Sequence, residues 1–176
     1  MNKSIGNLNI TNYCSENSEH IKFRKSLMND ESIYEFVSTT IGDDLLVHTE
    51  GNDIELDHSY IIEDKSKPIG YIYLEGLSEE EGTVELRYAV HSEYRRLGFS
   101  GYSDSNRKGY GQQILEECSK YLFTFDNINH IELHIRKDNE KSIGCAQKAK
   151  YKCIGEYQAE YYYIYRMDKG SRHYKN

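Results

Sequence analysis

The chain has 176 residues, of which 38% are hydrophobic and 12% aromatic, and this composition suits a single globular domain over residues 1–176. The formal net charge of −7 argues against nucleic acid as a partner, because phosphate backbones call for a basic surface. The same charge permits a cationic ligand such as an amine, or serves only to keep a small domain soluble.

The four cysteines form no C-x-x-C pair, so the sequence contains neither a zinc knuckle nor a redox motif. The first residues hold no apolar run typical of a signal peptide, and no stretch is long enough to cross a membrane. We therefore expect a reduced, cytoplasmic protein with no membrane partner and no metal.

The predicted elements begin with a short strand at residues 8–10. A helix through residues 21–27 follows, with Ser15 as its candidate cap, and then a second helical stretch at 33–41. The segment 42–58 is acidic and irregular. Three strands come next, at residues 59–63, 69–74 and 83–90, because the apolar period changes to two.

The second half of the chain alternates helices and strands. Residues 109–111 open an amphipathic helix, whose apolar stripe consists of Ile114, Leu115, Cys118 and Leu122. A strand at 131–135, a helix over 139–150 and two last strands near 153–157 and 161–167 complete the pattern. This order predicts an α/β domain with a mixed sheet.

The most informative local feature is a strand followed by a glycine-containing turn and a helix. Amides in the first turn of a helix have no acceptor within the helix, and the helix dipole adds positive potential there. Glycine lets the backbone approach a phosphate closely, so residues 108–112 are a candidate pyrophosphate cradle. The alternative is a glycine turn before an ordinary helix. Neither a P-loop nor a complete Rossmann fingerprint is present.

Two longer motifs carry a family resemblance. Residues 84–95, continued by 108–111, resemble the acetyl-CoA motif of GNAT acetyltransferases, and residues 131–143 with 146–151 resemble the strand and helix that follow it. The resemblance covers roughly residues 59–167 and is greatest to the ribosomal-protein N-terminal acetyltransferase (RimJ/RimL-like) branch. It implies a GNAT fold, with a central mixed, mostly antiparallel sheet of six or seven strands and about four flanking helices.

The resemblance also implies an acetyl-CoA site and the residues that form it. Arg95 or Arg107 takes the place of the usual Arg or Gln at Asn106, because residues 97–106 look inserted. Which arginine meets the phosphates stays open. The implied cofactor-binding residues are Ala89, Val90, Arg95, Arg96, Arg107, Lys108, Gly109, Tyr110, Gly111, Gln112 and Asn139.

Catalytic roles follow from the same resemblance, each beside a structural alternative. Glu85 matches a glutamate that acts as a base in many relatives, or it simply pairs with Arg87. Ser142 lies where the similar branch has a serine near the thiol, or it is an ordinary first-turn serine. Asn139 contacts the pantetheine arm, caps the helix, or does both.

Two predicted features depart from a simple acetyltransferase site. The tyrosine that many relatives use as general acid falls at Ala146, so that role passes elsewhere. His130 and His134 share one face of a strand, but no further metal ligands accompany them.

We expect an acetyl-CoA-dependent N-acetyltransferase that acts on a primary amine by direct attack. The acceptor is a protein N-terminus, a polyamine, an aminoglycoside-like compound or another small amine, and a homodimer is left open. The acidic segments 43–57 and 79–81 suit a cationic acceptor or are solvated surface. The alternative is a GNAT-fold protein that binds or senses CoA without turnover.

Overall fold

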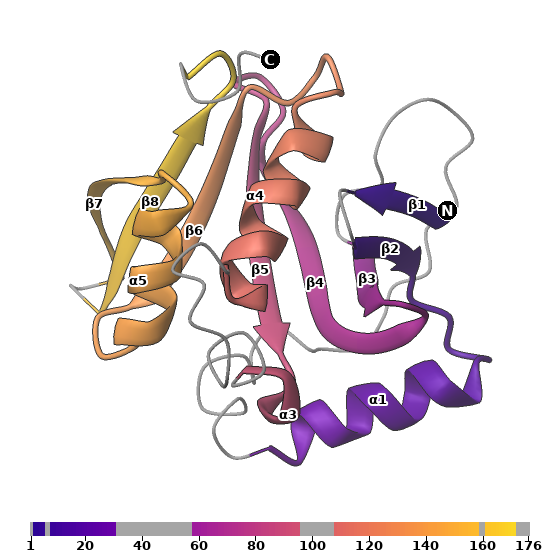
Figure 1. The fold of residues 1–176 in the computed structure, drawn as a ribbon. Coiled ribbons are helices and arrows are strands. Elements are labelled where there is room, and N and C mark those ends of the chain that lie inside the picture. Colours follow the sequence, from indigo (N-terminus) through magenta and orange to yellow (C-terminus); the bar gives the residue numbers. More distant parts are fainter. Residues whose placement is uncertain (1, 6–7, 31–57, 96–107, 159–160, 172–176) are drawn as a thin grey trace.

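The computed structural model describes residues 2–5, 8–30, 58–95, 108–158 and 161–171 (Figure 1). The predicted helix at 33–41 and the insertion at 97–106 lie outside these residues. The described part forms one eight-stranded sheet in the order β1-β2-β3-β4-β5-β6-β8-β7. Its strands are β1 (Asn2–Ile5), β2 (Leu8–Asn12), β3 (His58–Asp64), β4 (Lys67–Ser78), β5 (Thr83–Val90), β6 (His130–Arg136), β7 (Lys152–Tyr157) and β8 (Tyr162–Asp168).

The sheet confirms the expected fold class. All neighbouring strands pair antiparallel except β5 and β6, which are parallel. The sheet has one strand more than predicted, because β1 pairs with β2 from Asn2↔Thr11 to Ile5↔Leu8. A four-residue edge strand holds too few residues to give an alternating sequence pattern.

Four helices occur in the described residues: α1 (Ser18–Met28), α3 (Ser92–Arg95), α4 (Tyr110–Leu122) and α5 (Glu140–Lys148). The predicted cap of the first helix is wrong, since Asn17 and not Ser15 precedes α1. The Asn17 side-chain oxygen accepts from the Glu19 amide at 2.9 Å, which is the geometry of an N-cap.

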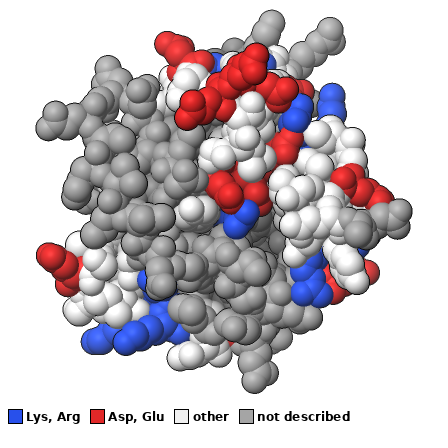
Figure 2. Space-filling model, turned by 180° about the vertical axis from the view of Figure 1, so that it is seen from behind, with Lys and Arg blue, Asp and Glu red and all other residues white. Residues whose placement is uncertain are grey.

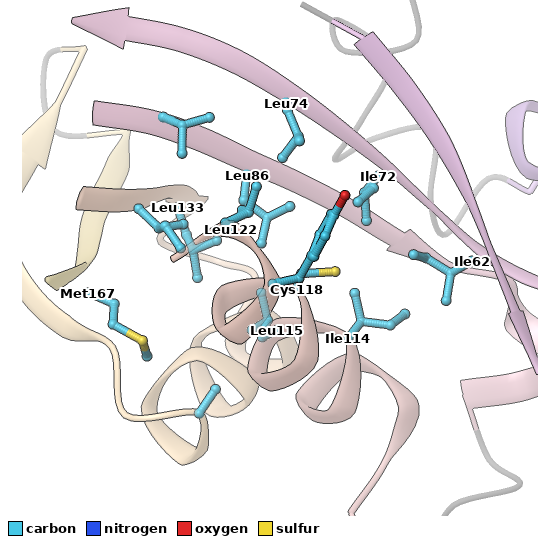
Figure 3. Close-up of a cluster of buried hydrophobic side chains, with 14 of the residues drawn as sticks. Ile62, Ile72, Leu74, Leu86, Ile114, Leu115, Cys118, Leu122, Leu133 and Met167 are labelled. Carbon is cyan, nitrogen blue, oxygen red and sulfur yellow. The ribbon is translucent and has the colours of Figure 1, made fainter. Parts of the chain in front are cut away.

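The main core lies between the sheet and α4. The predicted apolar stripe of α4 is buried against side chains of β4, β5 and β6 (Figure 3). This packing fixes α4 against the strands whose ends form the site described below. The fully or almost fully buried members that Figure 3 labels are Ile62, Ile72, Leu74, Leu86, Ile114, Leu115, Cys118, Leu122, Leu133 and Met167.

A second, smaller core covers the other face of the sheet. Leu27 of α1 is buried there with Ile61, Tyr71 and Ala89, which alternate along their strands with residues of the main core. Helices therefore cover both faces, with α4 on one and α1 on the other. The sheet is consequently a middle layer between helices.

Candidate active site

The site is a cleft at the point where β5 and β6 separate. The two strands pair only from Thr83↔His130 to Glu85↔Glu132. Beyond Glu85, β5 stays paired with β4 and β6 stays paired with β8, so the strands diverge (Figure 1). The cleft has a volume of ≈ 160 Å³. The residues lining it are Glu85, Leu86, Arg87, Tyr88, Leu133, His134, Ile135, Arg136, Asn139, Ser142, Tyr157, Gln158 and Tyr162.

The open edge of β5 presents main-chain groups of Val90. His91 donates its amide to Ile69 of β4 at 3.0 Å, and hydrogen-bond direction alternates along a strand. The main chain of Ala89, opposite Tyr71, therefore also faces β4, whereas that of Val90 faces away from it. The Val90 carbonyl accepts from Arg95 Nε at 2.8 Å, and burial lowers the pKa of Arg95.

The glycine turn leads into α4 as predicted. Gly109 is the N-cap and has no side chain to occupy the first-turn amides, which lack acceptors within the helix. At Gly111, a Cβ would lie 3.1 Å from Cys145 Sγ and 3.5 Å from the Tyr88 ring. The absence of side chains at these two positions keeps the start of α4 open to a phosphate and close to α5.

The side chains around this turn are held by acidic partners in the protein. Lys108 pairs with Glu116, and Gln112 donates to the other oxygen of Glu116 at 2.8 Å. The Tyr110 hydroxyl donates to Asp64 at 2.6 Å. Main-chain amides are therefore the phosphate donors that this turn offers most directly. The predicted residues Arg96 and Arg107 lie outside the described residues.

Two hydroxyls and a thiol lie beside the start of α5. Asn139 caps the helix and accepts from the Ser142 amide at 3.1 Å. The Tyr88 hydroxyl donates to Ser142 Oγ at 3.4 Å. Loss of hydration raises the pKa of Tyr88 well above its ordinary value, and the nearby Cys145 adds to this increase. Burial likewise raises the pKa of the Cys145 thiol.

The opposite side of the sheet carries a row of glutamates that alternate with two arginines and a histidine, which we call the charge ladder. It runs from β4 to β8 through six residues: Glu75, Arg87, Glu85, His134, Glu132 and Arg166. Figure 2 views the molecule from this side and shows acidic and basic side chains next to one another. Three members of the charge ladder, Glu85, Arg87 and His134, line the cleft.

Glu85 is the most buried acid of the charge ladder and is held by its neighbours. Its two oxygens accept from Arg87 at 2.8 and 3.1 Å, so the predicted pairing with Arg87 is present. Desolvation opposes protonation of Arg87, but the hydrogen bond and charge of Glu85 raise its pKa overall. Glu85 Oε2 also lies 3.3 Å from His134 Nδ1.

Sequence reasoning missed two residues of the cleft, Tyr88 and His134, and the contact of His134 with Glu132. His134 drew attention only as a metal ligand, although Glu132 two residues earlier lies on the same strand face. That spacing was a usable signal for the contact between His134 Nε2 and Glu132, which measures 3.1 Å. Within the described residues, no group of three or more His, Cys, Asp or Glu side chains is placed to hold a metal ion.

The geometry fits a thioester that enters along an opened strand edge. The helix start supplies amides for a diphosphate, Val90 offers main-chain groups beside it, and Glu85 and Ser142 flank the cleft. Coenzyme A has the corresponding parts, namely a diphosphate, an amide-containing arm and a terminal sulfur. No helix in the described part of the chain combines the length and apolar character needed to span a membrane. The fold and site therefore define an acyl-CoA-dependent acyltransferase.

The family model described as "Acetyltransferase (GNAT) domain" matches residues 10–152. The chain therefore belongs to the GNAT acetyltransferase family and is an acetyl-CoA-dependent N-acetyltransferase. No curated protein has significant sequence similarity to it.

Solved structures with the same fold include three acetyltransferases. RimL, the ribosomal L7/L12 alpha-N-protein acetyltransferase solved with coenzyme A, has a TM-score of 0.68 at 14% identity, covering 96% of this chain and 98% of its own. Spermidine N-acetyltransferase from Vibrio cholerae, solved with CoA and spermine, has a TM-score of 0.60 at 14% identity. The match covers 93% of this chain and 96% of the other. Aminoglycoside acetyltransferase AAC(6′)-Ib, solved with coenzyme A, has a TM-score of 0.60 at 16% identity. The match covers 91% of this chain and 95% of the other. The likeness to RimL accords with the expected branch, and at these identities it concerns the fold.

Proposed function

We propose that the protein transfers the acetyl group of acetyl-CoA to a primary amine that approaches from the charge-ladder side of the sheet. The observation that carries this proposal is the placement of Glu85 in the cleft where β5 and β6 separate. The acceptor is a protein N-terminus, a polyamine or an aminoglycoside-like amine, the classes on which the three similar structures act by name.

The bound cosubstrate supplies an activated acetyl carbonyl and a thiolate leaving group. Glu85 takes a proton from the amine as its nitrogen forms a bond to the carbonyl carbon. As the carbon–sulfur bond breaks, Ser142 gives a proton to the sulfur and regains one from water in the open cleft. Ser142 suits this role because Tyr88 donates to its oxygen, which leaves the serine O–H free to point elsewhere.

The proposed cofactor contacts follow the geometry of the helix start and the strand end. Amides of Gly111 and Gln112 hold the diphosphate, and the main chain of Val90 holds the pantetheine arm together with Asn139. Ala89 and Arg95 support the strand end, since Ala89 pairs with β4 and Arg95 bonds the Val90 carbonyl. Arg96, Arg107, Lys108, Gly109 and Tyr110 remain proposed from the family resemblance.

A thiol-release assay with acetyl-CoA tests the proposal over a panel of spermidine, kanamycin and a peptide with a free N-terminus. We expect turnover with at least one amine, none with the same peptide after N-acetylation, and a fall in kcat of about 100-fold in Glu85→Gln. CoA binding by calorimetry without turnover on any amine would favour a CoA-binding protein and contradict the proposal.

A further inference from the structure

The charge ladder places two buried carboxylates side by side. Glu85 and Glu132 are register partners at the last paired position of β5 and β6, and only 3% and 6% of their surfaces are exposed. Like charges on adjacent strands repel, so this pair needs cationic neighbours to be stable. The neighbours of the two carboxylates show how that requirement is met.

Each carboxylate has its own arginine, and both face one histidine. Arg87 donates to both oxygens of Glu85, and Arg166 donates to Glu132 Oε1 at 2.5 and 2.8 Å. The remaining oxygen of Glu132 lies 3.1 Å from His134 Nε2, and Glu85 Oε2 lies 3.3 Å from His134 Nδ1. His134 therefore lies between the two acids.

The two sides of the imidazole are not equivalent. The contact of Nε2 with Glu132 is a hydrogen bond, and a neutral imidazole has a single N–H to donate. With that proton on Nε2, Nδ1 presents a lone pair toward Glu85. Glu132 thus selects the tautomer by holding one nitrogen, as an orienting carboxylate does for a histidine base.

This arrangement decides where a proton from the acceptor amine comes to rest. A proton that stayed on Glu85 would remove the anion paired with Arg87, which is itself half-buried. A proton that moved on to Nδ1 would leave Glu85 as the anion paired with Arg87 and would place the imidazolium N–H 3.3 Å from Glu85 Oε2.

We propose that His134 holds the proton that Glu85 takes from the acceptor amine, and that Glu132 fixes the imidazole tautomer that makes this transfer work. The inference rests on the proposed role of Glu85. The amine N–H bond breaks, a proton reaches Glu85, an N–H bond forms at His134 Nδ1, and Glu85 returns to carboxylate. Water at the open cleft then removes the proton. His134 acts through Glu85 and is a positioning residue.

The surroundings of His134 contain charged groups on each neighbouring strand. Glu85 and Arg87 lie on β5, Glu132 on the same strand as His134, and Arg166 on β8. From β7, the ring of Tyr157 lies against the imidazole with centroids 4.9 Å apart. The ring contact limits water on one face of the imidazole, and Glu85 and Glu132 lie at its two nitrogens.

His130 offers a matched control for the test. It lies four residues earlier on β6 and pairs through Nδ1 with Asp168 at 2.8 Å, but it does not line the cleft. We would compare His134→Gln and His130→Gln by thiol release over pH, with thermal unfolding and CoA calorimetry to verify folding. We expect kcat to fall about 100-fold in His134→Gln but not in His130→Gln. The kcat of the wild type is expected to rise with pH as a histidine loses its proton, and this rise should be absent in His134→Gln.

A second measurement does not depend on turnover. Imidazole-nitrogen NMR of the wild-type protein, assigned with His134→Gln, is expected to show His134 protonated on Nε2 at high pH and gaining its second proton at Nδ1. A proton on Nδ1 alone, or an unchanged kcat–pH profile in folded His134→Gln, would overturn the inference. If the wild type acetylates no amine, the proposed function fails, and the NMR result still decides the tautomer.

Discussion

The raised pKa of the Tyr88 side chain makes the stability of the protein depend on pH in the alkaline range. The Tyr88 hydroxyl touches Ser142, and loss of hydration raises its pKa, so folded Tyr88 stays neutral at a pH where an unfolded tyrosine, with an ordinary pKa of 10.0, ionises. The folded state therefore binds one proton more than the unfolded state above that pH, and the stability from this group is lost as pH rises.

We predict that Tyr88→Phe flattens the alkaline loss of stability. Above about pH 10 the free energy of unfolding of the wild type falls more steeply than that of the variant, by about 1.4 kcal/mol per pH unit. Denaturant unfolding between neutral pH and pH 11 measures the difference. Tyr161→Phe is the control, because Tyr161 is exposed and should leave the slope unchanged. Equal slopes in wild type and Tyr88→Phe would show that Tyr88 ionises freely in the folded protein.

Contacts within one strand or one turn were predictable for individual residues. Glu85 with Arg87, and Asn139 with the start of its helix, are each separated by two or three positions, so periodicity alone places them together. The contact of Glu85 with His134 joins residues 49 positions apart across a parallel pair. The sequence pattern does not say which strands become neighbours, so the contact of His134 with Glu85 could only be found in the fold.

The approach of α4 to α5 depends on glycine at a single position. A Cβ at Gly111 would lie 3.1 Å from Cys145 Sγ, whereas a Cβ at Gly144, inside α5, would meet no atom within 4 Å. Both positions are helical, so alanine gains about 1 kcal/mol of intrinsic helix stability over glycine at each. Only Gly111 has to balance that gain against crowding.

Paired alanine substitutions test this difference. We expect Gly144→Ala to raise the free energy of unfolding by about 0.5–1 kcal/mol, and Gly111→Ala to lower it by about 1 kcal/mol because the helices must move apart. Chemical denaturation gives both values. Equal stabilisation by the two substitutions would mean that Cys145 moves aside at no cost and that the close approach does not constrain α4.

Most helices and strands could be predicted from the spacing of apolar residues along the sequence. The amphipathic stripe of α4 and the alternation in β3 to β6 were predicted and match the structure, because burial against one layer imposes those periods. The cap of α1 was predicted at the wrong residue, and the edge strand β1 was not predicted. Both depend on short polar segments in which several neighbouring residues have similar propensities.

At the scale of the whole molecule, the candidate active site lies at the one parallel strand pair of the described sheet, β5 and β6. In the described part of the chain, six of the seven strand pairs are antiparallel, whereas β5 and β6 are parallel, pair for three residues and then separate. The cleft at this opening is lined by Tyr88 and Ser142 on the α4 side and by Glu85 and His134 on the charge-ladder side. In the function that we propose, cosubstrate and acceptor approach from opposite faces and meet between the strands.

A structure of the protein with coenzyme A tests this account most directly. We predict the diphosphate at the amides of residues 110–112, the pantetheine arm along the open edge of β5 beside Val90, and the sulfur between Ser142 and Glu85. Coenzyme A bound away from the separation of β5 and β6, with the cleft unchanged, would contradict the account.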